Sequence, residues 1–525
     1  MQKLVPNTQT GSLADHQQGT DDTLSGVDDA SNVLFGDAFD MDDHASGGND
    51  TLTGGASHGS AASNTLYGDA FDMKDHARAG DDTLTGGVNL SSASTMSNTL
   101  YGDAFQIGDH ARGGDDTLTG GDNASSGLFD SSTTSNTLYG DAFDLNDHAR
   151  GGNDMLTGGD DLSTGLLANT HVSNTLYGDA NAMDGDTRGG DDTLTGGSSP
   201  VRHFITGYGG SVSNVLYGDA GDLHDNARGG DDSLMGGSAT APAGIGEGLH
   251  AINTLVGDGN LYDNARGGDD TLIGGSLAIN LVSGDAGSMH GNARGGNDTL
   301  AGGASSLNVL DGDAGTMDDN ARGGNDTLTA GSGSSPFGGG NLLFGDAEFM
   351  YGHSRGGNDT LTGAASASNL TGDGHEMHDD TRGGDDMLIG GAGTTTMRGD
   401  ADAMFDHATG GNDVLVSGTG TDHMWGDAQT IDGVAASPTA PTGDVKTGAD
   451  TFVFAPGSGT DFIYDFRQSD HDRIDVSAYG VHGLADMMIT GTAGDTTIAF
   501  DAANSVTLVG FADPTALRPS DFVFA

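Results

Sequence analysis

The sequence predicts an all-β solenoid of stacked short units, and two observations lead to this fold class. Close copies of the stretch 97–121 recur about a dozen times within residues 20–427. In that stretch Leu100 and Leu118 lie 18 residues apart, and the same spacing of 18 recurs in other copies. A chain with such regular self-similarity grows by stacking units on one another rather than by adding separate cores.

The composition shows that the polypeptide alone has little with which to stabilise a core. Hydrophobic residues make up 34% of the chain and the net charge is −59, a combination typical of disordered acidic segments. The fixed register between leucines and aspartates argues against a disordered tail. All but three of the 77 acidic residues are Asp, beside 94 Gly, which indicates tight turns that carry short carboxylates. Because the chain has no Cys, disulfides cannot supply the missing stability.

The copies without inserts indicate that the basic module has nine residues. Only 9 residues separate Leu361 from Leu370. Segment 417–425 fits the pattern Gly-Gly-x-Gly-x-Asp-x-(apolar)-x with Ser at the first position, and segment 390–398 fits it with Thr in place of Asp. Over about residues 20–430 the chain therefore resembles the RTX family of calcium-binding nonapeptide repeats. The resemblance implies a right-handed parallel β-roll or β-helix solenoid with inserted loops, several bound Ca²⁺ ions and secretion from the cell.

The middle nonapeptide of each unit departs from the family pattern. Its apolar residue, Ile107 in the stretch 97–121, stands two places early. This segment is either a half-turn with a shifted inward residue or a bulged loop. A unit of three nonapeptides would also suit a three-sided helix. We favour the two-sided roll and leave the three-sided helix open. The other shifted residues are Met73, Leu145, Met289 and Met317.

Two sets of aspartates are the candidate calcium ligands, since Ca²⁺ takes six to eight oxygen atoms from carboxylates and carbonyls. In the stronger set, the Asp stands one place before each Thr-Leu-Thr strand or its equivalent. The members of this set are Asp22, Asp50, Asp82, Asp116, Asp154, Asp192, Asp232, Asp270, Asp298, Asp326, Asp359, Asp386 and Asp413. We assign Asp422 to the same set. The second set contains the carboxylates of Gly-Asp-Ala segments, which act either as ligands or as turn caps. Its members are Asp69, Asp103, Asp141, Asp179, Asp219, Asp285, Asp313, Asp346, Asp400 and Asp427.

Ten of the 18 basic residues occupy one position of the repeat, which predicts a ladder of Arg–Asp contacts between units. These residues are Arg78, Arg112, Arg150, Arg188, Arg228, Arg266, Arg294, Arg322, Arg355 and Arg382. Another position of the repeat carries His in some copies and Asn in others. A position that bound a transition metal would not accept Asn in place of His. We therefore interpret this His as a hydrogen-bonding turn residue, found at His44, His76, His110, His148 and His407.

The composition changes after Asp427 and gives the predicted domain boundaries. Residues 1–19 form an N-terminal segment, 20–428 the repeat solenoid, 429–446 a linker, and 447–525 a C-terminal β domain. The last block resembles the capping and type I secretion domain of RTX proteins, including the one that follows the protease domain of serralysins. This resemblance implies export by type I secretion machinery. The N-terminal segment lacks the apolar run of a Sec signal peptide.

Variable inserts fall at one place in the unit and should project from one edge of the solenoid. They are segments 88–96, 122–134, 160–172 and 198–212. There are two interpretations of these inserts. They are either loops whose length and sequence vary without functional consequence, or a surface that binds another copy of the chain or a cell-surface partner.

No catalytic constellation emerges from the chain, and we expect that it is not an enzyme. The closest candidate, His375–His378, is one residue short of His-Glu-x-x-His. The sequence predicts a secreted calcium-binding structural protein of the cell surface, extracellular matrix or surface layer. The alternative is an adhesin or ice-binding protein that uses the Thr-rich face or the insert loops. The acidity disfavours nucleic acid, and no apolar run is long enough to span a membrane.

Overall fold

The computed structural model describes residues 4–6, 11–165, 168–199, 209–240, 251–335, 340–439, 443–492 and 494–525. The chain forms two compact units, Met1–Ala286 and Gly287–Ala525. This division lies inside the repeats and does not coincide with the boundaries at 428 and 446 that the composition suggested.

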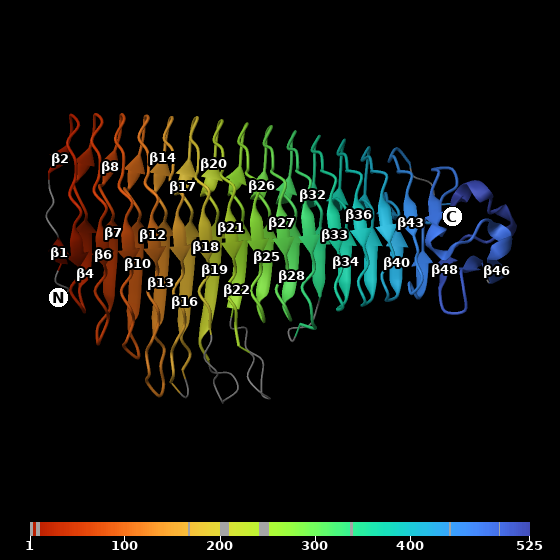
Figure 1. The fold of residues 1–525 in the computed structure, drawn as a ribbon, viewed down its shortest axis with the longest axis horizontal. Coiled ribbons are helices and arrows are strands. Elements are labelled where there is room, and N and C mark those ends of the chain that lie inside the picture. Colours follow the sequence, from red (N-terminus) through yellow and green to blue (C-terminus); the bar gives the residue numbers. More distant parts are fainter. Residues whose placement is uncertain are drawn as a thin grey trace. The chain divides into compact units, whose positions relative to one another are not determined.

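One turn of the solenoid consists of three strands that lie in three different parallel sheets (Figure 1). In unit 1 a representative turn contains β10 (Thr95–Tyr101), β11 (Gln106–Ile107) and β12 (Thr117–Thr119). Each strand pairs in parallel with the equivalent strand of the neighbouring turns, in unchanged register. The spacing of 18 between Leu100 and Leu118 is therefore the distance from the first sheet to the third, with the second sheet between them.

Within its described residues, unit 1 forms three such sheets, named sheets 1 to 3 in the order in which the chain visits them. Sheet 1 contains β1 (Leu4–Pro6), β4 (Ser31–Phe35), β7 (Ala62–Tyr67), β10, β13 (Thr133–Tyr139), β16 (His171–Tyr177), β19 (Ser211–Tyr217), β22 (Ala251–Val256) and β25 (Ile279–Ser283). Sheet 2 contains β2 (Ser12–Leu13), β5 (Asp40–Met41), β8 (Asp72–Met73), β11, β14 (Asp144–Leu145), β17 (Ala180–Met183), β20 (Ala220–Leu223) and β23 (Asn260–Leu261). Sheet 3 contains β3 (Thr23–Ser25), β6 (Thr51–Thr53), β9 (Thr83–Thr85), β12, β15 (Met155–Thr157), β18 (Thr193–Thr195), β21 (Ser233–Met235) and β24 (Thr271–Ile273). Strand β26 (Ala286–Met289) lies at the division between the units.

Unit 2 has three equivalent sheets within its described residues. The first contains β28 (Leu307–Asp311), β31 (Asn341–Phe344), β34 (Ser368–Thr371), β37 (Thr395–Arg398), β40 (Asp422–Trp425), β44 (Thr460–Ile463), β46 (Met488–Thr492), β47 (Asp495–Ala499) and β48 (Ser505–Leu508). The second contains β29 (Ala314–Met317), β32 (Ala347–Met350), β35 (Gly374–Met377), β38 (Ala401–Met404), β41 (Ala428–Ile431) and β42 (Val434–Ala435). The third contains β27 (Thr299–Ala301), β30 (Thr327–Thr329), β33 (Thr360–Thr362), β36 (Met387–Ile389), β39 (Val414–Val416), β43 (Thr451–Val453), β45 (Arg473–Asp475) and β49 (Phe522–Val523).

The parallel solenoid is confirmed, but the preference for a two-sided roll is wrong. The early apolar residue of the middle nonapeptide is the reason. Ile107 is fully buried and forms the separate short strand β11, so the irregular segment is a third side rather than a bulged loop. A strand of two residues needs only one inward side chain, which explains why that segment does not show the full nonapeptide pattern.

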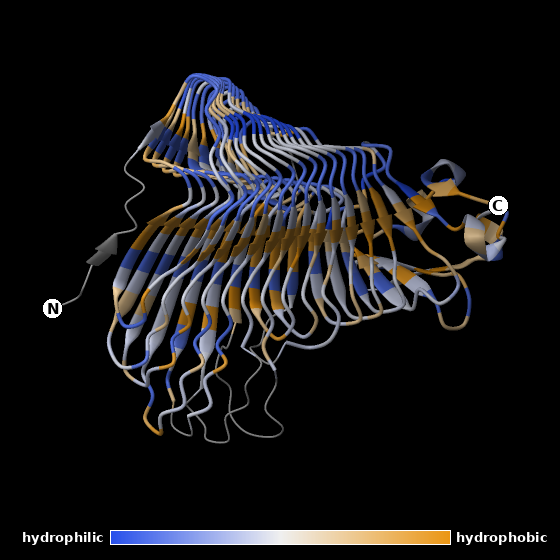
Figure 2. Cartoon of the chain, turned by 60° about the vertical axis from the view of Figure 1, so that its left-hand side comes forward, coloured by the Kyte–Doolittle hydropathy of each residue, from blue (hydrophilic) through white to orange (hydrophobic). Residues whose placement is uncertain are grey.

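Stacking of identical residues builds the core of unit 1. Leu100 and Leu118 are fully buried, and equivalent leucines continue them as apolar bands across neighbouring strands (Figure 2). Beside them, the asparagine of each sheet 1 strand from β4 to β25 is buried and belongs to an amide ladder. The Asn98 side-chain amide donates to Oδ1 of Asn136 at 2.9 Å, and that of Asn136 donates to Oδ1 of Asn174 at 2.8 Å. A second amide hydrogen bond, from the side chain of Asn136 to the Gly121 carbonyl at 3.0 Å, joins the ladder to the backbone.

Asn136→Ala should lower the free energy of unfolding by about 3 kcal/mol, because it leaves buried donors and acceptors on Asn98, Gly121 and Asn174 unsatisfied. Ser135→Ala, an exposed neighbour on the same strand, is the matched control and should change stability by less than about 0.5 kcal/mol. Denaturant melts of the calcium-loaded chain measure both variants. Equal effects of the two substitutions would contradict the structural role of the ladder.

The C-terminal block begins as a continuation of the repeats. β43 pairs in parallel with β39, and β44 with β40, while β46, β47 and β48 form an antiparallel meander. The helices of the described residues are single 3₁₀ turns, η1 (Ser477–Tyr479), η2 (Leu484–Asp486), η3 (Pro514–Ala516) and η4 (Pro519–Asp521). Among the described residues, none of these helices has the length and apolar character required to cross a bilayer.

The inserts of unit 1 project from one edge of the sheets, as the sequence predicted (Figure 1). Their bases are ordered by further parallel bridges, such as Asn89 to Asn123 and Asn123 to Asp161. The apolar insert residues Leu128 and Phe129 are exposed. Further apolar residues of the inserts lie outside the described residues, namely Leu166, Leu167, Phe204, Ile205 and Tyr208.

Candidate metal centre

The aspartates that precede the sheet 3 strands form a buried column in unit 1. The backbone N–H of each donates to Oδ1 of the equivalent Asp in the next turn, at 2.6 Å from Asp82 to Asp116 and from Asp116 to Asp154. In the six aspartates named next, the second carboxylate oxygen is buried and has no hydrogen-bond partner. This holds for Oδ2 of Asp50, Asp82, Asp116, Asp154, Asp192 and Asp232. One oxygen of each side chain thus orders the backbone, and the other remains for a ligand.

The Gly-Asp-Ala aspartates form a second buried column that caps the turn before sheet 3. Oδ2 of Asp69 accepts from the N–H of Gly80 at 2.8 Å, and Oδ1 of Asp141 accepts from the N–H of Gly152 at 3.0 Å. The turn-cap interpretation is therefore confirmed for these carboxylates. A carboxylate has about four acceptor sites, so capping does not prevent the same side chain from binding a cation.

The two columns converge, because each turn brings one Asp from either column to the same corner of the solenoid. Asp69, Asp82 and Asp103 each offer a carboxylate oxygen within 4.8 Å of the others, and so do Asp37, Asp50 and Asp69. All five side chains are buried. Asp69 and Asp103 come from neighbouring turns, so this group forms only when the solenoid stacks.

Backbone carbonyls enter the same corner because glycine leaves room for them. A Cβ placed on Gly68 would collide with both Oδ2 of Asp82 and the carbonyl oxygen of Gly102. Gly102 has the same surroundings one turn further on, with Oδ2 of Asp116 and the carbonyl of Gly140. Two oxygen acceptors therefore face one another without a donor between them, an arrangement that needs a proton or a cation.

The electrostatics of the corner reflect this shortage of positive charge. Burial raises the pKa of Asp50 to about 7 and, with the nearby Asp50 carboxylate, that of Asp82 to about 8. Burial raises the pKa of Asp116 well above its usual range, and the neighbouring Asp82 carboxylate adds to this effect. Burial without a cation therefore disfavours the charged form of these carboxyl groups.

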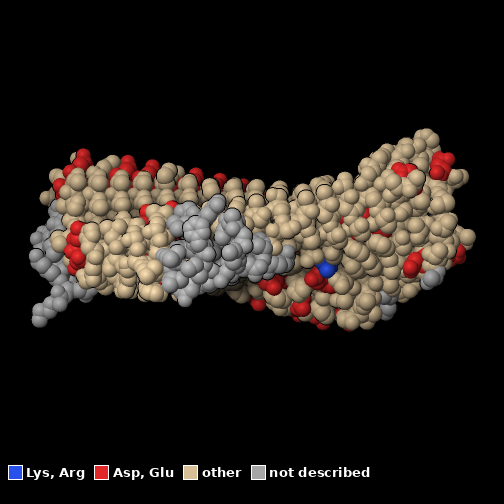
Figure 3. Space-filling model, turned by 90° about the horizontal axis from the view of Figure 1, so that it is seen from below, with Lys and Arg blue, Asp and Glu red and all other residues tan. Residues whose placement is uncertain are grey.

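The repeated arginines do not neutralise the columns, so the predicted Arg–Asp ladder is wrong. An arginine outside that position, Arg467, pairs with Asp427 of the Gly-Asp-Ala column at 3.4 Å. Within the described residues, the ion pairs formed by arginines involve Arg398 and Arg467, and none of the ten repeated arginines takes part. The repeated arginines of unit 1 have exposed side chains, whereas the columns are buried. On the face seen in Figure 3, basic groups are nearly absent and acidic groups stand out at scattered positions. Neutralising the other buried carboxylates of the described residues therefore takes either protons or a cation from outside the chain.

Unit 2 repeats the arrangement with its own residues. The N–H of Asp359 donates to Oδ1 of Asp386 at 2.7 Å, and that of Asp386 to Asp413 at 2.8 Å. The column continues past the repeats, from Asp413 to Asp450 at 2.9 Å and on to Asp472 at 3.2 Å. The C-terminal block thus contributes carboxylates to the column in addition to ending the solenoid.

The sequence missed several members of the two columns. Asp37, Asp258 and Asp373 are buried and belong to the Gly-Asp-Ala column. The last two stand in Gly-Asp-Gly, whose register with Gly-Asp-Ala would have identified them. Asp450 precedes the strand Thr451–Val453 just as Asp413 precedes Val414–Val416, so the same rule applied beyond residue 428 would have found it.

Asp422 belongs to a different position from the one the sequence suggested. It pairs with Thr395 in the first sheet of unit 2, in register with Ser368 and Asn341, at the place of the asparagine ladder. Its Oδ2 accepts from the N–H of Gly418 at 2.8 Å. The nonapeptide match placed it in the wrong column because a nine-residue pattern cannot distinguish the three sides of the solenoid.

The residues at the corner fit a hard divalent cation. The donors are carboxylate and carbonyl oxygens, the chemistry that Ca²⁺ and Mg²⁺ prefer, with no thiolate or imidazole among them. The unpartnered buried oxygens supply the independent evidence that the columns are more than an acidic surface.

Comparison of the sequence with models of known protein families gives no match, and comparison with curated proteins gives none either.

Proposed function

We propose that the chain is a secreted structural protein that folds around calcium and acts at the cell surface or in an extracellular matrix or surface layer. The observation that carries the proposal is the buried corner, where aspartates of neighbouring turns present oxygens without hydrogen-bond partners. Ca²⁺ held there links successive turns, so that binding free energy becomes folding free energy. A solenoid stabilised in this way stays extended where calcium is scarce and folds where it is abundant, which suits passage through type I secretion machinery.

Asp116→Asn tests this role at one corner. The substitution keeps the shape and the oxygen that accepts from Asp82 but removes the negative charge, so we expect the loss of at least one bound calcium per chain. Asp115→Asn is the matched control, since Asp115 is exposed in the same turn and its Oδ1 accepts only from the backbone of Asn153. Calorimetric titration of refolding protein with CaCl₂ counts the ions. Unchanged stoichiometry in Asp116→Asn, or an equal loss in both variants, would remove the corner as the binding site.

The second candidate, an ice-binding or adhesive surface, is favoured by one observation. Threonines on the outer face of sheet 3 stack in strict register, with Thr85 paired to Thr119 and Thr119 to Thr157. The row ends where Met235 and Ile273 take the same position. If this face orders ice, the folded chain will show thermal hysteresis that bulky substitutions at Thr119 abolish; a structural protein will show none.

A further inference from the structure

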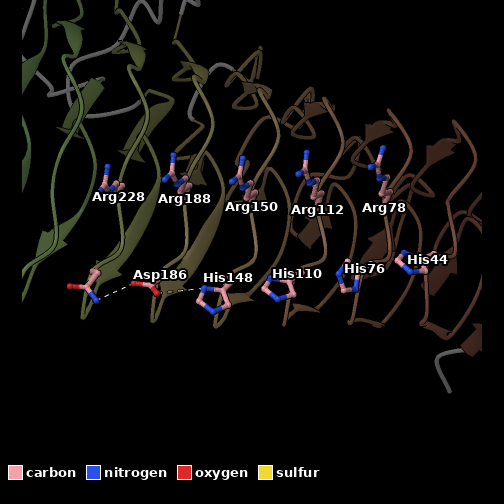
Figure 4. Close-up of a pocket in the computed structure, with 11 residues that line it drawn as sticks. His44, His76, Arg78, His110, Arg112, His148, Arg150, Asp186, Arg188 and Arg228 are labelled. Atoms are coloured by element: carbon pink, nitrogen blue, oxygen red, sulfur yellow. Dashed lines mark hydrogen bonds and ion pairs between the residues drawn. The ribbon is translucent and has the colours of Figure 1, made fainter.

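A groove of about 690 Å³ runs along unit 1 on the side of the repeated arginines (Figure 4). One row of side chains along it consists of Arg78, Arg112, Arg150, Arg188 and Arg228. A second row consists of His44, His76, His110 and His148, each two residues before the arginine position of its own repeat. We call the groove the Arg–His groove.

The arginine row concentrates positive charge without any counter-ion from the chain. Arg112 pairs directly with Arg150, and Arg150 with Arg188, across parallel bridges, and all three side chains are exposed. Like charges directly opposite on neighbouring strands are destabilising. Although the chain carries 77 acidic residues, none of the described carboxylates forms an ion pair with this row. The repeated like-charge pairs indicate that an external anion binds here.

The histidine row supplies a second wall of closely spaced rings. The rings of His110 and His148 stack with centroids 4.9 Å apart, and those of His44 and His76 lie 4.7 Å apart. At the far end Asp186 approaches Nδ1 of His148 at 3.6 Å and accepts from the side chain of Asn226 at 3.0 Å. This carboxylate marks the end of the histidine row and leaves the arginines unpaired.

We propose that the Arg–His groove binds a linear acidic polysaccharide that carries one carboxylate on each sugar. Neighbouring guanidinium groups repeat at the strand spacing of about 4.8 Å, close to the advance of a 1,4-linked chain per sugar ring. Each guanidinium fork matches a carboxylate with two parallel hydrogen bonds, and the sugar rings would lie against the edges of the imidazole rings. Weak contacts repeated along one ligand add up to useful affinity.

The spacing disfavours other linear anions. Stacked nucleic acid advances only about 3.4 Å along its axis per nucleotide, which does not match one anionic group per turn of the solenoid. An extended acidic peptide presents side chains of one face about 6.6 Å apart, which is too far. The net charge of the chain does not prevent binding, because charges beyond about 8 Å are largely screened at physiological salt.

The test is calorimetric titration of the calcium-loaded full chain with hexagalacturonate, a uronate oligomer short enough to stay soluble with calcium. We expect binding that weakens with added salt, and much weaker binding of monomeric galacturonate. The variant R112Q/R150Q should bind the hexamer about tenfold more weakly. R112K/R150K, which keeps the charge but loses the fork, should lie between the two. The control R473Q/R518Q removes the same charge from exposed positions of unit 2 and should bind like the unsubstituted chain.

Circular dichroism and calcium stoichiometry establish that the variants fold. The proposal is overturned if hexagalacturonate does not bind, or if R112Q/R150Q and R473Q/R518Q bind it equally. If inorganic phosphate binds as tightly as the hexamer, the groove binds small anions without preference for a polysaccharide, and the proposal is contradicted. Calcium-dependent self-association that R112Q/R150Q abolishes would show that the groove receives carboxylates of a second copy, and this too would contradict the proposal.

Discussion

Removal of calcium at neutral pH should convert the chain from a β-rich solenoid into an extended, largely disordered polypeptide. The net charge is −59, and the corner groups such as Asp69, Asp82 and Asp103 bring carboxylates together in buried positions. Ionising them without a cation costs several kcal/mol per buried charge, and this cost recurs at every turn. The stability of a whole small domain is only about 5–15 kcal/mol, so a few uncompensated corners are enough to unfold the chain.

Far-UV circular dichroism in excess chelator and after addition of millimolar CaCl₂ measures this transition, with sedimentation velocity to follow compaction. Magnesium is the appropriate second ion, because it demands a tighter octahedral geometry than Ca²⁺, and we expect it to restore less structure at equal concentration. A β signal that is the same in chelator and in calcium would contradict the proposed function at its foundation.

The metal-free chain should regain structure on acidification. In the folded state the pKa of Asp141 is raised to about 6, that of Asp50 to about 7 and that of Asp82 to about 8, in each case mainly through burial. These pKa values exceed the ordinary Asp value near 4. At pH values between 4 and the raised pKa values, the folded chain therefore binds more protons than the unfolded chain. Their contribution to stability is therefore fully present below about pH 4 and is lost as the pH rises through 6 to 8.

A pH series from 8 to 4 in chelator, followed by circular dichroism and by fluorescence of the single Trp425, should show β structure appearing on the acid side. Saturating calcium should reverse this dependence, because ligands must lose protons to bind the metal. Sedimentation at each pH distinguishes folding from aggregation near the isoelectric point of about 4.1. Structure in the metal-free chain that is lost toward acid pH would mean that the buried carboxylates are not the source of the instability.

The register of the fold could be predicted because the repeat itself encodes it. Leu100 and Leu118 are buried at the places that their spacing indicated, and inserts such as 122–134 enter at one edge. Asp116 could be selected as a candidate ligand because its position before a short apolar strand recurs in every unit. A parallel solenoid places equivalent residues on top of one another, so periodicity in the sequence becomes adjacency in space.

The number of sides could not be predicted in the same way. A two-residue strand such as β11 carries one inward residue, Ile107, and a single apolar position has no periodicity of its own. The ladder through Asn136 was also missed, because an inward asparagine is acceptable only when its amide finds partners in the next turn. Sequence patterns rank such a residue as a turn former, and only stacking supplies the partners.

The sequence by itself determined the all-β repetitive fold, the place of the inserts and the identity of the aspartates that recur before each strand. Only the tertiary structure decided that three sheets close each turn and that Asp69, Asp82 and Asp103 meet at one corner. It also decided that Arg112 and its equivalents lie apart from those carboxylates. The physical reason is that periodicity fixes which residues are equivalent, whereas contacts between non-equivalent residues depend on where each turn bends, and glycine turns bend without leaving a distinctive pattern.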